Sequence, residues 1–359
     1  MHIYHFILDH RTGGPHIYVQ GLSKFLHSFA SSTLATAGAG EATEWQLANL
    51  RHRSKFFYPI EVLLNSARIY WRFRKKTLRS GVVFDVHGAA NIAPIIAGRM
   101  LRVAVVWHFH ENLTQFGFLV RIGKFFLRGV PHKFVIVAER ARRVFDLPEA
   151  KLISGGVDVS FWTPSTEKMP KNKTIKLLSV GNINPLKGHD LLLSALEKLQ
   201  YPCELTIVGA ELHTFLNYAT MLRDRAKLLE RYGICLEFEG FQARDVVRKL
   251  LNQTDIFVLS SRNEACPLAL LEAMSVGCAC VATDVGDVSD ILSSSENGIL
   301  VSAENVDALA EGLQRAVSMT SQARSLMGQH ARGRVVERYS LERMAESHRE
   351  LYTEVIRKI

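Results

Sequence analysis

The stretch DIFVLSSRNEACPLALLEAMSVGCACVAT, residues 255–283, combines a short apolar strand, a loop, a helix of small residues and a second apolar strand. Two glutamates, Glu264 and Glu272, stand in this apolar setting on either side of Pro267. An unpaired carboxylate buried in a core is strongly unfavourable. The two acids are therefore expected either to reach solvent or to line a site.

The local order of residues favours a ligand site. Glu264 lies in the loop that leaves the carboxyl end of the strand, and Pro267 suits the first position of the helix. The start of that helix offers free N–H groups and a positive end to an anion. Glu272 lies about one and a half turns further on. Carboxylates accept hydrogen bonds from hydroxyls, so a ligand with both a phosphate and free hydroxyls, such as a sugar nucleotide, fits both acids.

Both halves of the chain alternate short apolar runs with segments of helical periodicity. The runs are HIYHFIL (2–8), VVFDVHG (82–88), RVAVVWHF (102–109), KFVIVA (133–138), KLLSVGNI (176–183), CELTIVG (203–209), ICLEFEG (234–240), DIFVLSS (255–261) and CACVAT (278–283). Such runs are typical of parallel strands buried on both faces. The alternation predicts an α/β protein of two doubly wound, Rossmann-like domains.

The polar, proline-bearing stretch around residues 162–175 predicts the linker between the domains. We therefore expect domains at 1–165 and 166–340, with a final amphipathic helix at 341–359 that packs back on the first domain. Two such domains facing each other form a central cleft, bounded by the carboxyl ends of the strands, where ligands of these sheets bind.

Length and composition agree with two folded domains. The chain has 359 residues, 47% of them apolar and 22% charged, which describes a globular protein rather than a disordered one. No apolar run approaches the roughly 18 residues of a membrane-spanning helix, and the first residues lack the features of a signal peptide. The five cysteines include no C-x-x-C pair, which favours a reduced, cytoplasmic protein without structural zinc.

The net charge of +9 is concentrated in the first half of the chain. Residues 1–165 hold 21 Lys and Arg against 10 Asp and Glu, a net +11, and the remainder carries −2. Two basic segments contain aromatic residues, RIYWRFRKKTLR (68–79) and FGFLVRIGKFFLRG (116–129). The second predicts a helix with basic residues opposite apolar ones: Arg121, Lys124 and Arg128 opposite Phe118, Ile122 and Phe125.

These basic helices favour an anionic membrane surface as a partner. The alternative is a pair of ordinary core-facing helices whose basic faces are solvated. Nucleic acid is not expected, because no recognition motif accompanies the charge.

The stretch from Asn263 to Leu292, with ENGILV at 296–301, resembles the signature region of family 4 retaining glycosyltransferases of GT-B fold, the group 1 transferases of bacterial polysaccharide and glycolipid synthesis. Other segments match that family in the same order. They are RTGGPHIYVQGLSKFL (11–26), VFDVHG (83–88), VVWHFHEN (105–112), ISGGVDVSFWTP (153–164) and SVGNINPLKGHDLLLSALEKL (179–199).

The resemblance implies roles for individual residues of the second domain. Glu264 would bind hydroxyls of the donor sugar, and Glu272 the ribose of the nucleotide. Lys187 would lie against the diphosphate, in the loop that begins at Gly181. The family has arginine where this chain has Asn182, and an asparagine cannot supply that charge. Arg262 is a candidate substitute for the missing cation.

The resemblance also implies roles in the first domain. His110, at the end of its strand, would help to organise the reaction centre, and His108 is expected to point elsewhere. His87 would contact the acceptor. Gly13 and Gly14 would let the backbone approach a phosphate or the acceptor, although a plain tight turn explains them as well.

No bound cofactor or metal is expected, because the donor is a substrate and no D-x-D triplet is present to hold an ion on its diphosphate. The sequence thus predicts a retaining, metal-independent glycosyltransferase that uses a nucleotide sugar, with a UDP-sugar favoured over a GDP-sugar. Its acceptor would be a glycan or a lipid-linked glycan at the inner face of the cell membrane. Two alternatives remain open, a GT-B sugar-nucleotide epimerase and a degenerate, non-catalytic partner of an active transferase.

Overall fold

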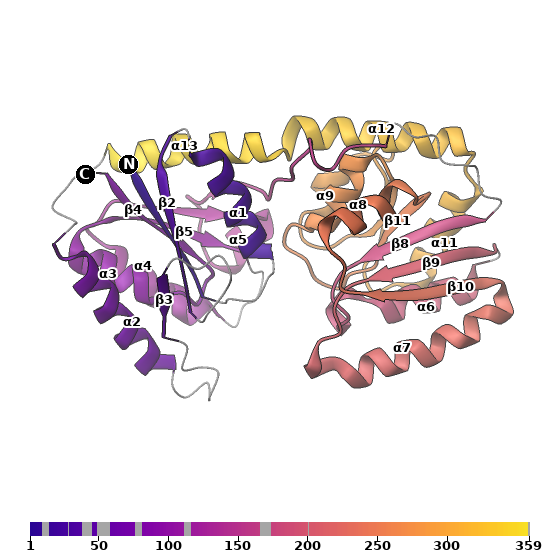
Figure 1. The fold of residues 1–359 in the computed structure, drawn as a ribbon, viewed down its shortest axis with the longest axis horizontal. Coiled ribbons are helices and arrows are strands. Elements are labelled where there is room, and N and C mark those ends of the chain that lie inside the picture. Colours follow the sequence, from indigo (N-terminus) through magenta and orange to yellow (C-terminus); the bar gives the residue numbers. More distant parts are fainter. Residues whose placement is uncertain are drawn as a thin grey trace. The chain divides into compact units, whose positions relative to one another are not determined.

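The computed structural model describes residues 1–8, 14–27, 29–37, 45–48, 58–75, 81–110, 116–165, 174–199 and 201–357. It contains two compact units (Figure 1). Unit 1 comprises Met1–Gly156 together with Leu341–Ile359, and unit 2 comprises Val157–Ser340. The division falls before the predicted boundary at 165, because Val157 and Trp162 bury their side chains in the core of unit 2.

The sheet of unit 1 is parallel, and its strand order is β3-β2-β1-β4-β5-β6-β7. Its strands are β1 (His2–Ile7), β2 (Ser31–Ala37), β3 (Trp45–Leu47), β4 (Val82–His87), β5 (Ala104–Phe109), β6 (His132–Ile136) and β7 (Lys151–Leu152). β5 is buried at every residue, as expected of a central strand covered on both faces.

The helices of unit 1 are α1 (Gly14–Leu26), α2 (Tyr58–Phe73), α3 (Ala93–Leu101), α4 (Gly117–Leu127), α5 (Glu139–Val144) and α13 (Leu341–Ile356). α13 is the final helix of the chain, and it packs on α1 and on β5. It buries Leu351, Tyr352 and Val355 completely or nearly so. The final helix therefore belongs to the core of unit 1, although the residues before it belong to unit 2.

The sheet of unit 2 is also parallel, with the order β10-β9-β8-β11-β12-β13. Its strands are β8 (Ile175–Val180), β9 (Cys203–Val208), β10 (Ile234–Gly240), β11 (Ile256–Leu259), β12 (Ala279–Thr283) and β13 (Ile299–Val301). Its helices are α6 (His189–Lys198), α7 (Leu216–Leu229), α8 (Arg244–Asn252), α9 (Leu268–Val276), α10 (Val288–Leu292), α11 (Val306–Ser318) and α12 (Ser321–Arg338).

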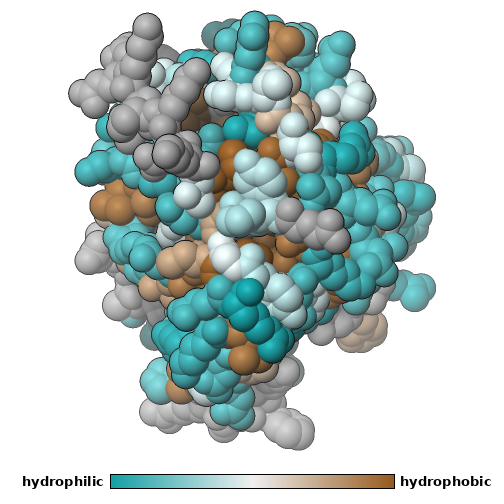
Figure 2. Space-filling view, turned by 90° about the vertical axis from the view of Figure 1, so that its right-hand side faces the viewer, coloured by the Kyte–Doolittle hydropathy of each residue, from teal (hydrophilic) through white to brown (hydrophobic). Residues whose placement is uncertain are grey.

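Each apolar run singled out in the sequence forms a strand, so the prediction of two parallel α/β sheets is confirmed. None of the helices within the described ranges is long and apolar enough to cross a membrane. Figure 2 shows one face of the molecule, on which hydrophilic side chains surround a smaller area of hydrophobic ones.

The faces of α4 differ from those predicted. Phe118 and Phe125 are 72% and 61% exposed, while Val120 and Leu127 face the core. Residues 118, 121, 125 and 128 follow the three- and four-residue spacing of one helical stripe, so the two phenylalanines share a side with Arg121 and Arg128. The prediction that they lie opposite the basic residues was wrong.

Candidate functional site

In unit 2, the sheet has a topological switch point between β8 and β11. The chain runs outward from β8 through β9 to β10, and from β11 through β12 to β13 on the other side. Open α/β sheets bind ligands outside the carboxyl ends of the strands at such a point. The loop that follows β8 begins at Gly181, and the loop that follows β11 begins at Ser260. These loops contain most of the predicted donor-binding residues.

The two loops are hydrogen-bonded to each other. The backbone N–H of Arg262 donates to the carbonyl of Leu186 at 2.8 Å, and the hydroxyl of Ser260 donates to the carbonyl of Lys187 at 3.1 Å. Gly188 permits this approach, because a Cβ at its position would lie 2.0 Å from the carbonyl oxygen of Ser260. Its φ of +63° is also in the left-handed region that favours glycine.

Lys187 and Glu264 meet at the switch point. The ammonium Nζ of Lys187 lies 2.6 Å from Oε1 of Glu264, and the hydroxyl of Ser261 donates to the same oxygen at 2.7 Å. The side chains of Lys187 and Glu264 are 28% and 12% exposed, so both remain accessible to a ligand. The structure therefore brings together the residue predicted for the diphosphate and the residue predicted for the sugar hydroxyls.

The helix after Glu264 is α9, and it begins one residue later than predicted. Pro267 is its N-cap, with an extended backbone, and its carbonyl accepts from the N–H of Leu270 at 3.1 Å. Glu272 lies on α9 and is partly buried. Burial raises the pKa of Glu272 to about 7, and the charge of Arg244 only partly opposes this rise. A carboxyl group that titrates near neutrality is typical of functional sites.

Arg262 does not stand free beside the loop. Its guanidinium donates to both carboxylate oxygens of Asp190 at 2.8 and 2.7 Å, and to the carbonyl of Pro185 at 2.7 Å. Burial by itself would raise the pKa of Asp190, but hydrogen bonds from Arg262 and Tyr218 lower it to about 2. The guanidinium therefore holds the loop and α6 together, and its role as a substitute cation remains a prediction.

Asn182 lies exposed at the end of β8. Its side-chain oxygen accepts from the N–H of Ala210 at 3.3 Å, so it is held only weakly. A Cβ at the neighbouring Gly181 would lie 3.2 Å from the side chain of Lys187, which shows how closely that lysine follows the loop. Asn182, Gly181 and Lys187 are thus neighbours at the predicted phosphate loop.

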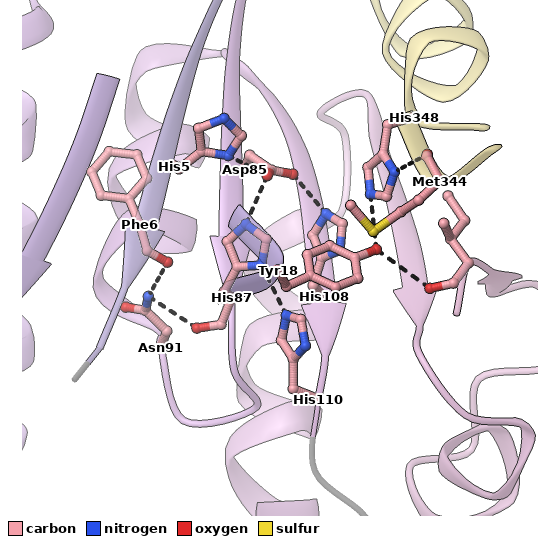
Figure 3. Close-up of polar contacts among 11 residues, drawn as sticks. His5, Phe6, Tyr18, Asp85, His87, Asn91, His108, His110, Met344 and His348 are labelled. Atoms are coloured by element: carbon pink, nitrogen blue, oxygen red, sulfur yellow. Dashed lines mark hydrogen bonds and ion pairs between the residues drawn. The ribbon is translucent and has the colours of Figure 1, made fainter. Parts of the chain in front are cut away.

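Unit 1 has its own switch point, between β1 and β4. Gly14 is the first residue of α1, the helix that follows β1, and Gly13 lies outside the described residues. The carboxyl ends of β1, β4 and β5 carry a cluster of histidines around one buried carboxylate (Figure 3).

Asp85 is the centre of this histidine cluster. Its Oδ2 accepts from His5 Nδ1 at 2.7 Å and from His87 Nε2 at 2.8 Å, and its Oδ1 accepts from His108 Nε2 at 2.7 Å. His110 follows β5 and contributes Nε2, which lies 2.9 Å from His87 Nδ1. His348 of α13 stacks on His108, with ring centroids 5.3 Å apart.

The electrostatics of the cluster favour an ionised Asp85 and neutral rings at His87, His110 and His348. Burial alone would raise the pKa of Asp85, but His108 and His87 hold it well below its ordinary value. Burial lowers the pKa of His87 to about 4 and that of His348 to about 3, and it lowers the pKa of His110 well below its ordinary value. At neutral pH these imidazoles are therefore uncharged.

The expectation that His108 points away from His110 was wrong, because residues two apart on a strand lie on the same face. The same alternation in VFDVHG puts Asp85 on the face of His87, and this signal would have revealed Asp85. His87 is buried, and both its ring nitrogens bond within the cluster. Its predicted contact with an acceptor remains a prediction.

Comparisons with known proteins agree with this geometry. Residues 163–334 match the family model of glycosyl transferases group 1. An uncharacterized glycosyltransferase of Methanocaldococcus jannaschii is 29% identical over 49% of this chain and 44% of its own length. An uncharacterized glycosyltransferase of Haemophilus influenzae is 27% identical over 68% of each chain. The match covers 44% to 52% of the length of the Methanocaldococcus relative and of two other curated relatives.

Solved structures show the fold of the whole chain. The crystal structure of Anabaena HepE in complex with UDP and glucose superposes with a TM-score of 0.82 at 16% identity. The superposition covers 99% of this chain and 100% of the HepE chain. The predicted fold class, two doubly wound α/β units of the GT-B type, is thereby confirmed.

Proposed function

We propose that this chain, with its GT-B fold and a glycosyl transferases group 1 domain at residues 163–334, is a retaining glycosyltransferase that uses a nucleotide-sugar donor. The observation that carries the proposal is the Lys187–Glu264 pair, held at the switch point of unit 2 just before α9. A cation, a carboxylate and a helix N-terminus at one sheet edge suit a ligand with a diphosphate and sugar hydroxyls.

Each group would have a separate part in the transfer. Lys187 and the N–H groups at the start of α9 would stabilise the diphosphate as it leaves, without a divalent ion on it. Glu264 would orient the sugar hydroxyls, and Glu272 would accept from the ribose. The acceptor oxygen would form its bond to the anomeric carbon on the side from which the phosphate oxygen departs, and that phosphate would take the acceptor proton. His110 would help to organise this reaction centre.

A UDP-sugar is the donor that we favour. The support is the likeness in fold to HepE, whose structure contains UDP and glucose. Purified protein should release nucleoside diphosphate from a panel of nucleotide sugars only when an acceptor is present, in proportion to product. Release of nucleoside diphosphate without any acceptor, accompanied by a change in the sugar's configuration, would favour the epimerase and exclude the transferase. An absence of any nucleotide binding would favour a non-catalytic partner.

Asn182→Arg is expected to tighten binding of the nucleoside diphosphate about 10- to 150-fold, because it adds a charge-assisted contact of roughly 1.5–3 kcal/mol. Isothermal titration with UDP and GDP would measure the change. Asn182→Gln, which adds length without charge, is the matched control and should leave the affinity unchanged. Weaker binding by a folded Asn182→Arg variant would show that the loop is shaped around asparagine, and the assignment of Lys187 would then have to be tested again.

The acceptor that we favour is a lipid-linked glycan at the inner face of the cell membrane. Two helices of unit 1 support this proposal, because they turn apolar side chains outward. In α2, Leu63 and Trp71 are 67% and 60% exposed, while Asn65 and Ser66 are buried. Asn65 uses its amide to hold the backbone of Ala48, with bonds of 2.8 and 3.0 Å.

The exposed face of α4 repeats this combination of apolar and basic residues. Phe118 and Phe125 lie beside Arg121 and Arg128, and the guanidinium of Arg128 lies 5.6 Å from the ring centre of Phe125. The guanidinium of Arg74, just after α2, lies 3.7 Å from the ring centre of Trp71. Apolar side chains with basic neighbours suit the interface of an anionic bilayer.

Reversing Arg121, Lys124 and Arg128 to Glu is expected to abolish binding to anionic vesicles, since each basic residue near such a surface contributes about 1 kcal/mol. Co-sedimentation with anionic and neutral vesicles would measure the binding. It should be repeated at low and high salt, because salt screens an electrostatic attraction. Reversal of three exposed basic residues of unit 2, Arg231, Lys249 and Arg338, makes the same change in net charge and should leave binding intact. Binding that survives the first reversal would exclude α4 as the contact.

A further inference from the structure

Three ring nitrogens lie close to one another in the histidine cluster of unit 1. His87, His108 and His110 each offer one nitrogen, and these atoms lie within 4.8 Å of one another. His87 Nδ1 and His110 Nε2 lie 2.9 Å apart (Figure 3). The three residues come from β4 and from β5 and its end, next to the switch point of this sheet.

Asp85 fixes the tautomers of two of these rings. It accepts from Nε2 of both His87 and His108, so in each neutral ring the proton is on Nε2 and the lone pair is on Nδ1. His108 Nδ1 is fully buried and has no hydrogen-bond partner among the residues that the structure describes. A buried lone pair without a donor is costly and needs an explanation. A bound cation would satisfy it.

We propose that His87, His108 and His110 bind one divalent transition-metal ion of the Zn²⁺ type, with Asp85 as the carboxylate that orients two of the ligands. Imidazole is the ligand that such ions commonly take, and a histidine ligand usually donates its other N–H to a carboxylate. At Zn–N distances of about 2.0–2.1 Å, tetrahedral ligand atoms lie roughly 3.3 Å apart. The ring nitrogens would need only small side-chain shifts to reach that spacing.

The charge state of the cluster suits the ion. A metal-bound histidine must be neutral, and burial holds the pKa of His87 at about 4 and lowers that of His110. Asp85 is ionised, and it would offset part of the ion's charge in the buried interior. On binding, the ion would replace the hydrogen bond from His110 Nε2 to His87 Nδ1, and the single proton of the neutral His110 ring would move from Nε2 to Nδ1.

A second group of possible ligands, His5, Asp85 and His87, is less suitable. A metal between these residues would break the bonds from both rings to Asp85 Oδ2. The lone pair of His108 would still lack a partner. The first group keeps all three bonds to Asp85 and uses that lone pair.

Three protein ligands leave a fourth position for water or another oxygen donor. The ion would be held by residues of unit 1 alone, and a D-x-D triplet concerns an ion on the donor's diphosphate, so the absence of that triplet does not bear on this site. The inference does not depend on the proposed transfer, because metal binding is measured without donor or acceptor.

The test uses the full chain without a histidine tag, freed of metal with a chelator and titrated with Co²⁺. One equivalent should bind and give the intense visible bands of four-coordinate cobalt, and Zn²⁺ should displace it. His110→Ala should lose this binding, His110→Cys should keep a ligand and restore it, and Asp85→Asn should weaken it about 10- to 100-fold. His5→Ala and the surface variant His330→Ala are controls that should each retain one equivalent.

Several outcomes would overturn the site. They are a wild-type protein that binds no Co²⁺ tightly, a bound equivalent that survives His110→Ala, and loss of the equivalent in His330→Ala. His110 is only partly buried, so its replacement is expected to leave the fold intact, which circular dichroism would verify. The test therefore does not require replacement of the fully buried His87 or His108.

Discussion

Lys187→Met is expected to lower kcat/KM for sugar transfer by about 100- to 1000-fold, the usual cost of removing one preorganised group that stabilises developing charge. Methionine keeps the length of the side chain but not its charge. Glu264 would lose its 2.6 Å partner and keep the hydroxyl of Ser261, so the loop should remain folded. Steady-state kinetics with the best donor, together with the affinity for nucleoside diphosphate, would measure the effect.

Lys176→Met is the matched control for this variant. Lys176 also belongs to the β8 region and pairs with a glutamate, Glu204, at 3.7 Å, but both side chains are more than a third exposed. Exposed pairs contribute little to stability, so transfer and folding should both be nearly unchanged. A Lys187→Met enzyme with full kcat/KM would remove the lysine from the reaction and leave the switch-point assignment without its main support.

Glu272→Gln is expected to make unit 2 more stable at pH 8 while it weakens nucleotide binding. Folding raises the pKa of Glu272 from 4.5 to about 7, so the folded protein favours the protonated form. Its stabilising contribution is complete below pH 4.5 and is lost as the pH rises through 7. The loss amounts to at most roughly 3 kcal/mol, and less where water screens the partly exposed carboxyl group. The neutral glutamine should not show this loss.

Hydrogen exchange of peptides from α9 between pH 5 and 8, corrected for intrinsic rates, would measure the stability of unit 2 separately from that of unit 1. The wild-type opening free energy should fall across this range, and that of Glu272→Gln should stay level. Nucleotide affinity should change in the opposite sense, because an ionised carboxylate is the better acceptor for ribose hydroxyls. A wild-type affinity that does not rise through pH 7 would mean that Glu272 does not contact the ribose. Glu237→Gln, at an exposed position of β10, is a suitable control.

The apolar runs predicted the strands well because buried parallel strands have a simple requirement, which is a continuous run of apolar residues between polar loops. The predicted donor residues lie together for the same reason, since β8 and β11 are neighbours and their loops leave the same edge. Glu264 and Lys187 could therefore be paired from sequence order and a doubly wound topology alone.

Other features depend on packing that sequence order does not reveal. Arg262, in the loop after β11, is held by Asp190 of α6, and nothing in the spacing of these residues indicates that pair. The outward aromatic residues of α4 reverse the usual rule that apolar side chains face the core, so a hydrophobic pattern misassigns Phe118. His348 joins the histidine cluster only because α13 returns to unit 1.

The return of α13 has a consequence for biosynthesis. The 157–340 segment is continuous, so the ribosome has made all of unit 2 before it adds Leu341. Unit 1 is begun first, yet it lacks Leu351, Tyr352 and Val355 of its core until the segment after Ser340 has been made. Domains usually acquire their structure in the order of synthesis, from the N-terminus onward. Of the two units, the first to be begun should therefore complete its folding last, and its nascent form should expose to chaperones the apolar surface that α13 later covers.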